Sequence, residues 1–141
     1  MTAPLLIDSG FLYVLFDHDD RYHPAVAAVI EAVGSTAIVP DVVLVEVAFL
    51  ARRAGGIPAV VRFLEYFENG GFQIEALTRQ DIRRARELID SYADARLDFV
   101  DTCVMAIAER LDARRVATID PRDFLLVRPT HCEHFDILPS L

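Results

Sequence analysis

The sequence alternates short apolar segments with longer segments of helical periodicity, and this alternation restricts the fold more than any other feature. The five short segments, which are typical of strands, are residues 4–8, 35–40, 72–77, 114–120 and 134–138. Most of the helices predicted between them have ten or more residues, which is the length that a crossover between parallel strands needs. The pattern therefore predicts an α/β protein with three α/β/α layers and a mostly parallel central sheet.

Local signals at the segment ends divide the helices from one another. We expect helices at residues 9–16, 23–34, 41–56, 57–71, 78–94 and 97–111, and a turn at residues 121–124. Asp41 is expected to be an N-cap, and Thr78 with an acid three residues later is typical of a capping box. With 141 residues and 53% hydrophobic content, the chain is expected to form a single domain, residues 1–141, around one core.

Composition limits the classes of function. The formal net charge of −8 argues against a protein that holds nucleic acid on a broad basic face. A bound divalent cation changes the local sign of the charge, so this composition is compatible with a metal-dependent site. No apolar run is long enough to cross a bilayer and no signal peptide is evident, so we expect a soluble, cytoplasmic protein. Cys103 and Cys132 form no disulfide or metal-binding pattern.

Two acidic residues stand at the ends of predicted strands. Asp8 ends the first strand and Asp120 ends the fourth. Ligands of open parallel sheets bind beyond the carboxyl ends of the strands, so both acids are expected at a site. Each also has a structural alternative, because Asp8 could only cap the helix that begins near Ser9, and Asp120 before Pro121 fits an ordinary turn.

Two further acids lie on helix faces that the pattern predicts to be buried. Glu46 shares its face with Val43 and Phe49, and Asp101 lies one turn after Asp98 on a largely apolar stripe. Asp98 is expected to be the N-cap of its helix, which puts Asp101 at a position that acids favour through the helix dipole. A buried carboxylate is costly unless a cation balances its charge, so both inward acids need a partner.

Either arginine or a metal ion can balance these charges. A single arginine neutralises one acid, and a buried ion pair with an arginine from elsewhere in the chain is the alternative explanation for Glu46. A hard divalent cation balances several acids at once, and ligand sets made only of oxygen suit Mg²⁺ or Mn²⁺. We therefore infer a carboxylate site for Mg²⁺, with Mn²⁺ as the alternative ion.

Four motifs, taken in order, resemble the PIN-domain family of metal-dependent ribonucleases, and within it the VapC-like toxins of bacterial type II toxin–antitoxin pairs. The motifs are LIDSGFLYVLFD, VVLVEVAFL, FVDTCVMAIAERL and VATIDPRDF. The resemblance covers nearly the whole chain and implies a PIN-like domain. It also implies Mg²⁺-dependent endoribonuclease activity on an RNA substrate, a small VapB-like antitoxin protein as partner, and a homodimer.

The resemblance further implies a role for each acidic residue. The catalytic site would consist of Asp8, Glu46, Asp101 and Asp120, with Asp8 and Asp101 as the direct metal ligands, and with Asp98 and Asp123 peripheral. Ser9 would lie near the metal or a phosphate group. The arginines that could bind substrate are Arg52, Arg53, Arg122 and Arg128, and among them we single out Arg122.

Other readings of the chain are weaker or remain open. Receiver domains of response regulators and haloacid-dehalogenase-like phosphatases depend on a lysine, and all 14 basic residues here are arginine. A PIN-like module that binds RNA or protein without catalysis remains the alternative. The apolar residues of VVRFLEYF, 60–67, are expected in the core rather than in a partner contact. The HCEH stretch at 131–134 fits no standard metal site.

Overall fold

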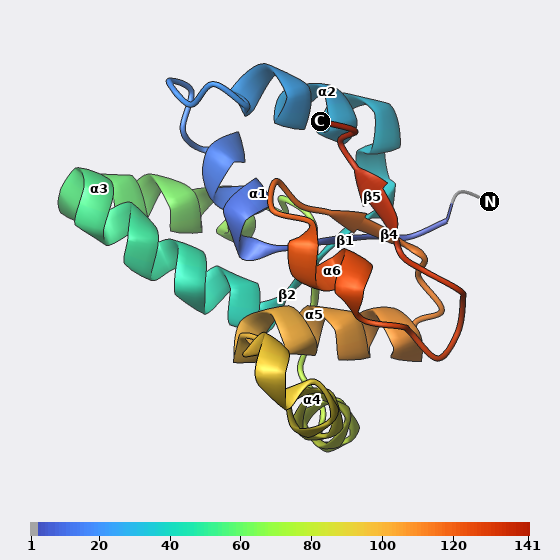
Figure 1. Ribbon diagram of the computed structural model, residues 1–141. Helices are drawn as coiled ribbons and strands as arrows, with labels where there is room; N and C mark the ends of the chain where they lie inside the picture. Colours follow the sequence, from blue (N-terminus) through green and yellow to red (C-terminus); the bar gives the residue numbers. More distant parts are fainter. Residues whose placement is uncertain (1–2) are drawn as a thin grey trace.

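Residues 3–141 of the chain are described by a computed structural model (Figure 1). One sheet contains β1 (Leu5–Ile7), β2 (Ala37–Pro40), β3 (Gln73–Glu75), β4 (Arg115–Ala117) and β5 (Asp136–Leu138) in the order β3-β2-β1-β4-β5. All four neighbouring pairs are parallel, with Leu6 of β1 opposite Ile38 of β2 on one side and Val116 of β4 on the other. The predicted α/β/α arrangement is confirmed, and the sheet is wholly parallel.

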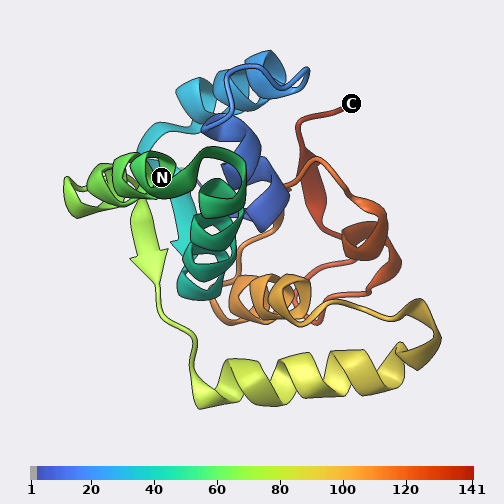
Figure 2. The same ribbon diagram turned by 90° about the vertical axis from the view of Figure 1, so that its left-hand side faces the viewer.

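Helices cover both faces of this sheet. They are α1 (Ser9–Leu15), α2 (His23–Val33), α3 (Asp41–Glu68), α4 (Arg79–Ser91), α5 (Phe99–Arg110) and α6 (Arg122–Leu126), with short 3₁₀ helices η1 (Gly34–Thr36) and η2 (Ala93–Ala95). One face carries α1 and α2, and the other carries α5 (Figure 1). Helix α4 packs on the outer side of α5, away from the strands (Figure 2).

The central strand is the most deeply buried part of the fold. Leu5, Leu6 and Ile7 of β1 are each 0% exposed, since helices lie over both faces of the sheet and strands flank both edges. A strand that is buried on both faces needs a continuous apolar run, which explains why this segment does not alternate. The chain therefore leaves β1 at the middle of the sheet, and the next residue, Asp8, begins in the interior.

Helix α3 consists of two arms that meet at a bend. Gly56 has φ 70 and ψ −163 within the segment, and this conformation interrupts the helical backbone. A positive φ is accessible to glycine because glycine lacks a Cβ atom, and Pro58 fits the first turn of the second arm. The sequence predicted two helices at 41–56 and 57–71, and the bend confirms their division.

Two local predictions were wrong. Asp41 does not cap α3: it lies in the first helical turn, and both of its carboxylate oxygens accept the Leu77 N–H at 3.3 Å. This contact joins residues far apart in the sequence, so a local capping signal cannot reveal it. The expected turn at residues 121–124 is part of the short helix α6.

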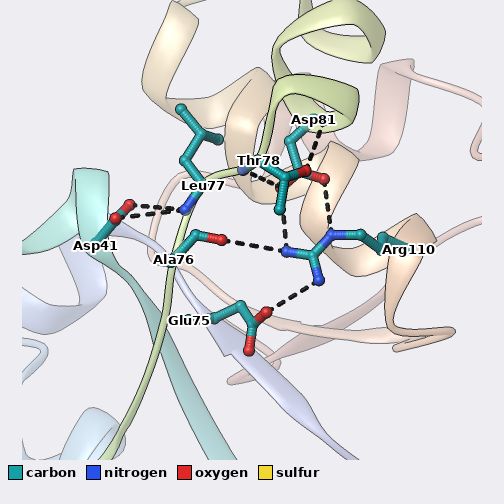
Figure 3. A network of polar contacts seen from close by, with 7 residues as sticks. All are labelled: Asp41, Glu75, Ala76, Leu77, Thr78, Asp81 and Arg110. Atoms are coloured by element: carbon teal, nitrogen blue, oxygen red, sulfur yellow. Dashed lines mark hydrogen bonds and ion pairs between the residues drawn. The ribbon is translucent and has the colours of Figure 1, made fainter.

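The amino end of α4 and the carboxyl end of α5 are held together by a network of charged groups (Figure 3). Arg110 donates to Asp81 at 3.0 Å and to Glu75 at 2.9 Å, and Thr78 and Asp81 form the predicted capping box. Burial acts to raise the pKa of Asp81, but hydrogen bonds from Arg110 and Thr78 outweigh it and hold that pKa below its ordinary value. The pair therefore stabilises the folded state in full above the unfolded pKa of an aspartate, and this contribution is lost as the pH falls through the lower folded pKa of Asp81.

Replacing Arg110 should weaken this junction. In Arg110→Met the aliphatic stem remains but Asp81, whose side chain is 1% exposed, loses its cationic partner. We expect the free energy of unfolding to fall by about 2 kcal/mol, below the value for a fully buried pair because Arg110 is partly exposed. Urea denaturation at neutral pH measures the change. A loss below about 0.5 kcal/mol, the range of ordinary surface substitutions, would show that the network contributes little to stability.

Some apolar residues of α3 are not in the core. Within the stretch 60–67, Phe63 is 2% exposed, but Val61, Leu64 and Tyr66 are 45%, 49% and 41% exposed. The expectation that this stretch belongs to the core is therefore correct only in part. None of the helices in the described residues is both long and apolar enough to cross a membrane.

Candidate functional site

Asp8 occupies the junction between β1 and α1. Its side chain is 5% exposed, and one carboxylate oxygen accepts the Phe11 N–H at 2.9 Å, so Asp8 is the N-cap of α1. The prediction that Asp8 could cap the helix beginning near Ser9 is therefore confirmed. Capping does not account for the charge, since the Phe11 N–H and the nearby Thr118 hydroxyl are neutral groups and Asp8 forms no ion pair within residues 3–141.

The electrostatic environment of Asp8 is unfavourable to a negative charge. Burial is the largest effect and raises its pKa to about 6, and the charges of Asp120 and Glu46 act in the same direction. The Thr118 hydroxyl and the Phe11 N–H oppose this shift. The Thr118 hydroxyl also donates to the Asp120 carbonyl oxygen at 3.1 Å, so one hydroxyl serves both Asp8 and Asp120. Asp8 thus needs a further cation or proton.

Asp101 lies in the first turn of α5, where the environment is also unfavourable to a negative charge. Burial again has the largest effect and raises its pKa to about 7, followed by the charges of Asp8 and Asp98 and, more weakly, of Asp123 and Glu46. No hydrogen bond to the Asp101 carboxylate within the described residues opposes this shift, whereas Thr118 and Phe11 lower the pKa of Asp8. The helix dipole explains why an acid is tolerated at this position, but it does not remove the repulsion.

Asp98 and Asp123 are less enclosed. Asp98 is exposed and caps α5, since one carboxylate oxygen accepts the Val100 N–H at 3.1 Å and the Asp101 N–H at 3.4 Å. Asp123 lies 3.4 Å from Arg122 in an ion pair that is open to solvent on the arginine side. Capping by Asp98 was predicted and is confirmed, and the charges of both acids raise the pKa of Asp101.

Glu46 and Asp120 complete the group from two other elements. Glu46 lies in the second turn of α3 and is half-buried. It forms no ion pair within the described residues, so the alternative explanation for Glu46, an ion pair with an arginine from elsewhere in the chain, finds no partner there. Asp120 follows β4 and is exposed, and its N–H donates to the Thr118 hydroxyl at 3.0 Å. Both act on Asp8 through their charge, so the fold brings the predicted acids within electrostatic reach of one another.

Ser9 contributes an unpartnered polar atom to this site. It is 5% exposed and follows Asp8 directly, and its hydroxyl oxygen is buried without a hydrogen-bond partner among residues 3–141. A buried hydroxyl without a partner is costly, so such atoms commonly mark a place where a ligand or ion binds. The sequence analysis did not predict a role for Thr118. This residue is 1% exposed and contacts both Asp8 and Asp120.

The donor set fits a hard divalent cation. Asp8 is buried, Glu46 and Asp101 are half-buried, and none of the four acids pairs with an arginine or histidine among residues 3–141, so with the Ser9 hydroxyl they give a site made of oxygen with excess negative charge. In the described part of the chain, however, no three His, Cys, Asp or Glu side chains already stand in a cluster ready to hold an ion. Carboxylates that share a site raise one another's pKa values, so these acids come together at a cost unless a cation or a proton balances them.

The predicted substrate arginines lie at different places. Arg122 is 78% exposed and is held beside Asp123, at the rim of the acidic group. Arg53 lies over the ring of Phe49, 5.9 Å from its centroid, on the outer face of α3. The expectation that Phe49 is buried with Glu46 was wrong, since the Phe49 side chain is 60% exposed.

The sheet is wholly parallel and has helices on both faces. Acids lie at the carboxyl ends of two central strands and on two helices. These features define a class of α/β proteins with an acidic site at the carboxyl ends of the strands. The PIN domain model matches residues 5–128 of this chain. The chain belongs to the PIN-domain family. The expected resemblance is thus confirmed for the larger part of the sequence.

Several relatives share this fold. Ribonuclease VapC26 of Mycobacterium tuberculosis is 25% identical over 135 residues, covering 96% of this chain and all of VapC26. The crystal structure of M. tuberculosis VapC20, described as a sarcin-ricin loop cleaving toxin, has a TM-score of 0.80 at 19% identity and covers 92% of this chain and 98% of that one. VapBC2 from Rickettsia felis, bound to a promoter DNA fragment, has a TM-score of 0.70 at 11% identity, with 96% and 98% covered.

Proposed function

We propose that this protein is a Mg²⁺-dependent endoribonuclease of the VapC type, a toxin that hydrolyses RNA phosphodiester bonds in the cytoplasm, where its substrate is found. The observation that carries the proposal is the pair Asp8, which is buried, and Asp101, which is half-buried; both have raised pKa values and no cationic partner within the described residues. Membership of the PIN family and the likeness to Ribonuclease VapC26 support the same activity.

Asp8 and Asp101 are the residues that would hold the metal ion, with Ser9 beside them. A bound Mg²⁺ or Mn²⁺ would lower the pKa of a water molecule bound to it and would polarise a phosphoryl oxygen. The acidic residues alone would repel the RNA backbone, so substrate binding requires that their charge be balanced. This requirement explains how a chain of net charge −8 can act on a polyanion.

The remaining acids would orient the reacting groups. Glu46 on α3 and Asp120 after β4 both act on Asp8 through their charge, and each has carboxylate oxygens that can accept a hydrogen bond from water. A carboxylate that accepts a hydrogen bond from the attacking water aligns it and takes up its proton. Arg122 would donate to a phosphate at the rim, while Asp98 and Asp123 would remain peripheral.

A VapB-like antitoxin is the proposed partner of this chain, and residues 1–141 are proposed to form a single domain that pairs as a homodimer. Solved structures of similar fold include the VapBC2 complex from Rickettsia felis and a toxin–antitoxin complex from Klebsiella pneumoniae, which has a TM-score of 0.65. An antitoxin that covers the acidic residues would neutralise the enzyme by excluding RNA from them.

Incubation of the purified protein with total RNA tests the activity. We expect discrete cleavage products in the presence of Mg²⁺ or Mn²⁺, no products with excess EDTA, and recovery when Mg²⁺ is restored. Sequencing the 5′ ends of the products identifies the target. RNA binding without cleavage under all metal conditions would instead support the alternative, a PIN-like module that acts by binding.

Ser9→Ala should separate activity from stability. Because the Ser9 hydroxyl has no partner within the described residues, its removal should leave the free energy of unfolding unchanged or raise it by about 1 kcal/mol. Cleavage should fall roughly tenfold, as for groups that support a metal site. Ser9→Thr, which keeps a hydroxyl, is the control and should retain more activity. Unchanged cleavage by Ser9→Ala would remove Ser9 from the site.

A further inference from the structure

The outer face of α3 exposes apolar side chains beside the acidic site. Val45 and Phe49 are 74% and 60% exposed, whereas Val43 and Val47 on the opposite face of the same arm are fully buried. The exposed ring lies three residues after Glu46, so the two side chains are neighbours on the helix surface, with about 5–6 Å between their Cβ atoms. An aromatic surface therefore begins next to one of the proposed catalytic acids.

Arg53 is placed over this ring. Its guanidinium carbon lies 5.9 Å from the Phe49 centroid, and Arg53 forms no ion pair in the part of the chain that the structure describes. An arginine that stacks on an aromatic ring keeps its N–H donors free at the ring edge. The combination offers a flat apolar surface, a planar cation and unused hydrogen-bond donors in one place.

These groups match one nucleotide of an unpaired RNA strand. Single-stranded nucleic acids are bound through bases that stack on aromatic rings and through arginines that contact the adjacent phosphates. A phosphate would be repelled by Glu46 and its acidic neighbours, and Arg53 supplies the opposite charge one helical turn after Phe49, whereas Glu46 lies one turn before it. Bases in a duplex are already stacked and have no free face for the ring.

We propose that Phe49 and Arg53 form a binding site for an unpaired base next to the scissile phosphate. The base stacks on Phe49, and Arg53 donates to a phosphate of the same nucleotide or its neighbour. This site rests on the proposed ribonuclease function and extends it, since it restricts the substrate to RNA that is single-stranded, or looped out, at the cut. Phe49→Ala should weaken binding of such RNA roughly 5- to 150-fold, equivalent to about 1–3 kcal/mol.

The composition of the chain provides a direct probe of stacking. The protein has no tryptophan, so Phe49→Trp introduces a single tryptophan at the proposed site, which can be excited selectively over the four tyrosines, while keeping an aromatic ring. The Asp101→Asn background keeps the RNA intact. We expect a saturable quenching of this fluorescence by a labelled single-stranded oligoribonucleotide, whose binding is followed independently by anisotropy. The same oligonucleotide paired with its complement should not quench.

Ile57→Trp is the matched control. Ile57 is also an exposed apolar residue of α3, at 56%, but it lies two turns beyond Phe49 and past the bend at Gly56. Quenching at residue 49 and not at residue 57 supports the base site, whereas equal quenching, or RNA binding without quenching, overturns it. If Phe49→Ala changes the oligomeric state in light scattering but leaves RNA affinity unchanged, the face is a protein interface and the proposal fails.

The two proposals fail in different ways. A wild-type protein that cuts no RNA, together with quenching at residue 49, would refute the nuclease and leave the base site standing. A protein that cuts RNA while the Phe49→Trp signal stays constant in the Asp101→Asn background would refute only the base site. Arg53→Gln adds a second readout, since loss of one phosphate contact should lower the slope of log affinity against log salt by about 1.

Discussion

Asp101→Asn is expected to reduce metal-dependent RNA cleavage at least about a hundredfold, because it removes a charge from the pair proposed to hold the ion while preserving shape and helix position. The burial and negative neighbours of Asp101 are the reason for this large effect: a neutral amide relieves the repulsion but cannot replace a charged oxygen ligand. Single-turnover cleavage of an identified RNA target at saturating Mg²⁺ measures the loss. Asp8→Asn should behave alike, since asparagine also caps helices well.

Asp98→Asn is the matched control for this prediction. The substitution is chemically identical and lies three residues earlier, but Asp98 is exposed, and within residues 3–141 its side chain accepts hydrogen bonds from N–H groups of α5 alone, a role that asparagine fulfils equally. Its cleavage rate should stay within a few-fold of the wild type. If both variants lose activity equally, the effect comes from the start of α5 as a whole, and Asp101 has no special role.

Local chemistry explains which parts of the structure the sequence could predict. The capping residues Asp98 and Thr78 act on backbone groups two or three positions away, so their roles are encoded in a few consecutive letters. The parallel sheet was predictable for a similar reason, because strand and helix lengths leave few other connections. The acids after β1 and β4 were predicted as neighbours from the common direction of the strands, without knowledge of any distance.

The errors arise where a residue depends on distant parts of the chain. Asp41 binds the Leu77 N–H across 36 positions, and no local signal distinguishes that role from capping. The helical pattern placed Phe49 with the buried face, but only Val43 and Val47 of this arm are fully buried, and the arm turns the Phe49 ring outward. Periodicity gives the relative angle of side chains on a helix but not the width of the surface that a neighbour covers.

The metal-free protein is expected to become less stable as the pH rises from 5 to 8. Asp8 and Asp101 have pKa values of about 6 and about 7 in the folded state against 3.8 for the ordinary carboxyl. Between pH 5 and pH 8 the folded state therefore binds more protons than the unfolded chain, so the free energy of unfolding falls as the pH rises from 5 to 8. The combined change should be on the order of 3 kcal/mol, allowing for coupling between the two acids.

Urea denaturation in EDTA at pH 5 and pH 8 measures this change, and comparison with Asp101→Asn isolates it from other groups. The variant should show a smaller loss, because one of the two acids no longer ionises. Asp81 does not interfere, since its lowered pKa puts its titration below this window. Mg²⁺ should restore wild-type stability at pH 8 by binding only the folded, ionised site, and it should stabilise the variant less. A wild-type protein that gains stability from pH 5 to 8 in EDTA, or that responds to Mg²⁺ no more than the variant does, would show that these acids are balanced within the protein and need no cation.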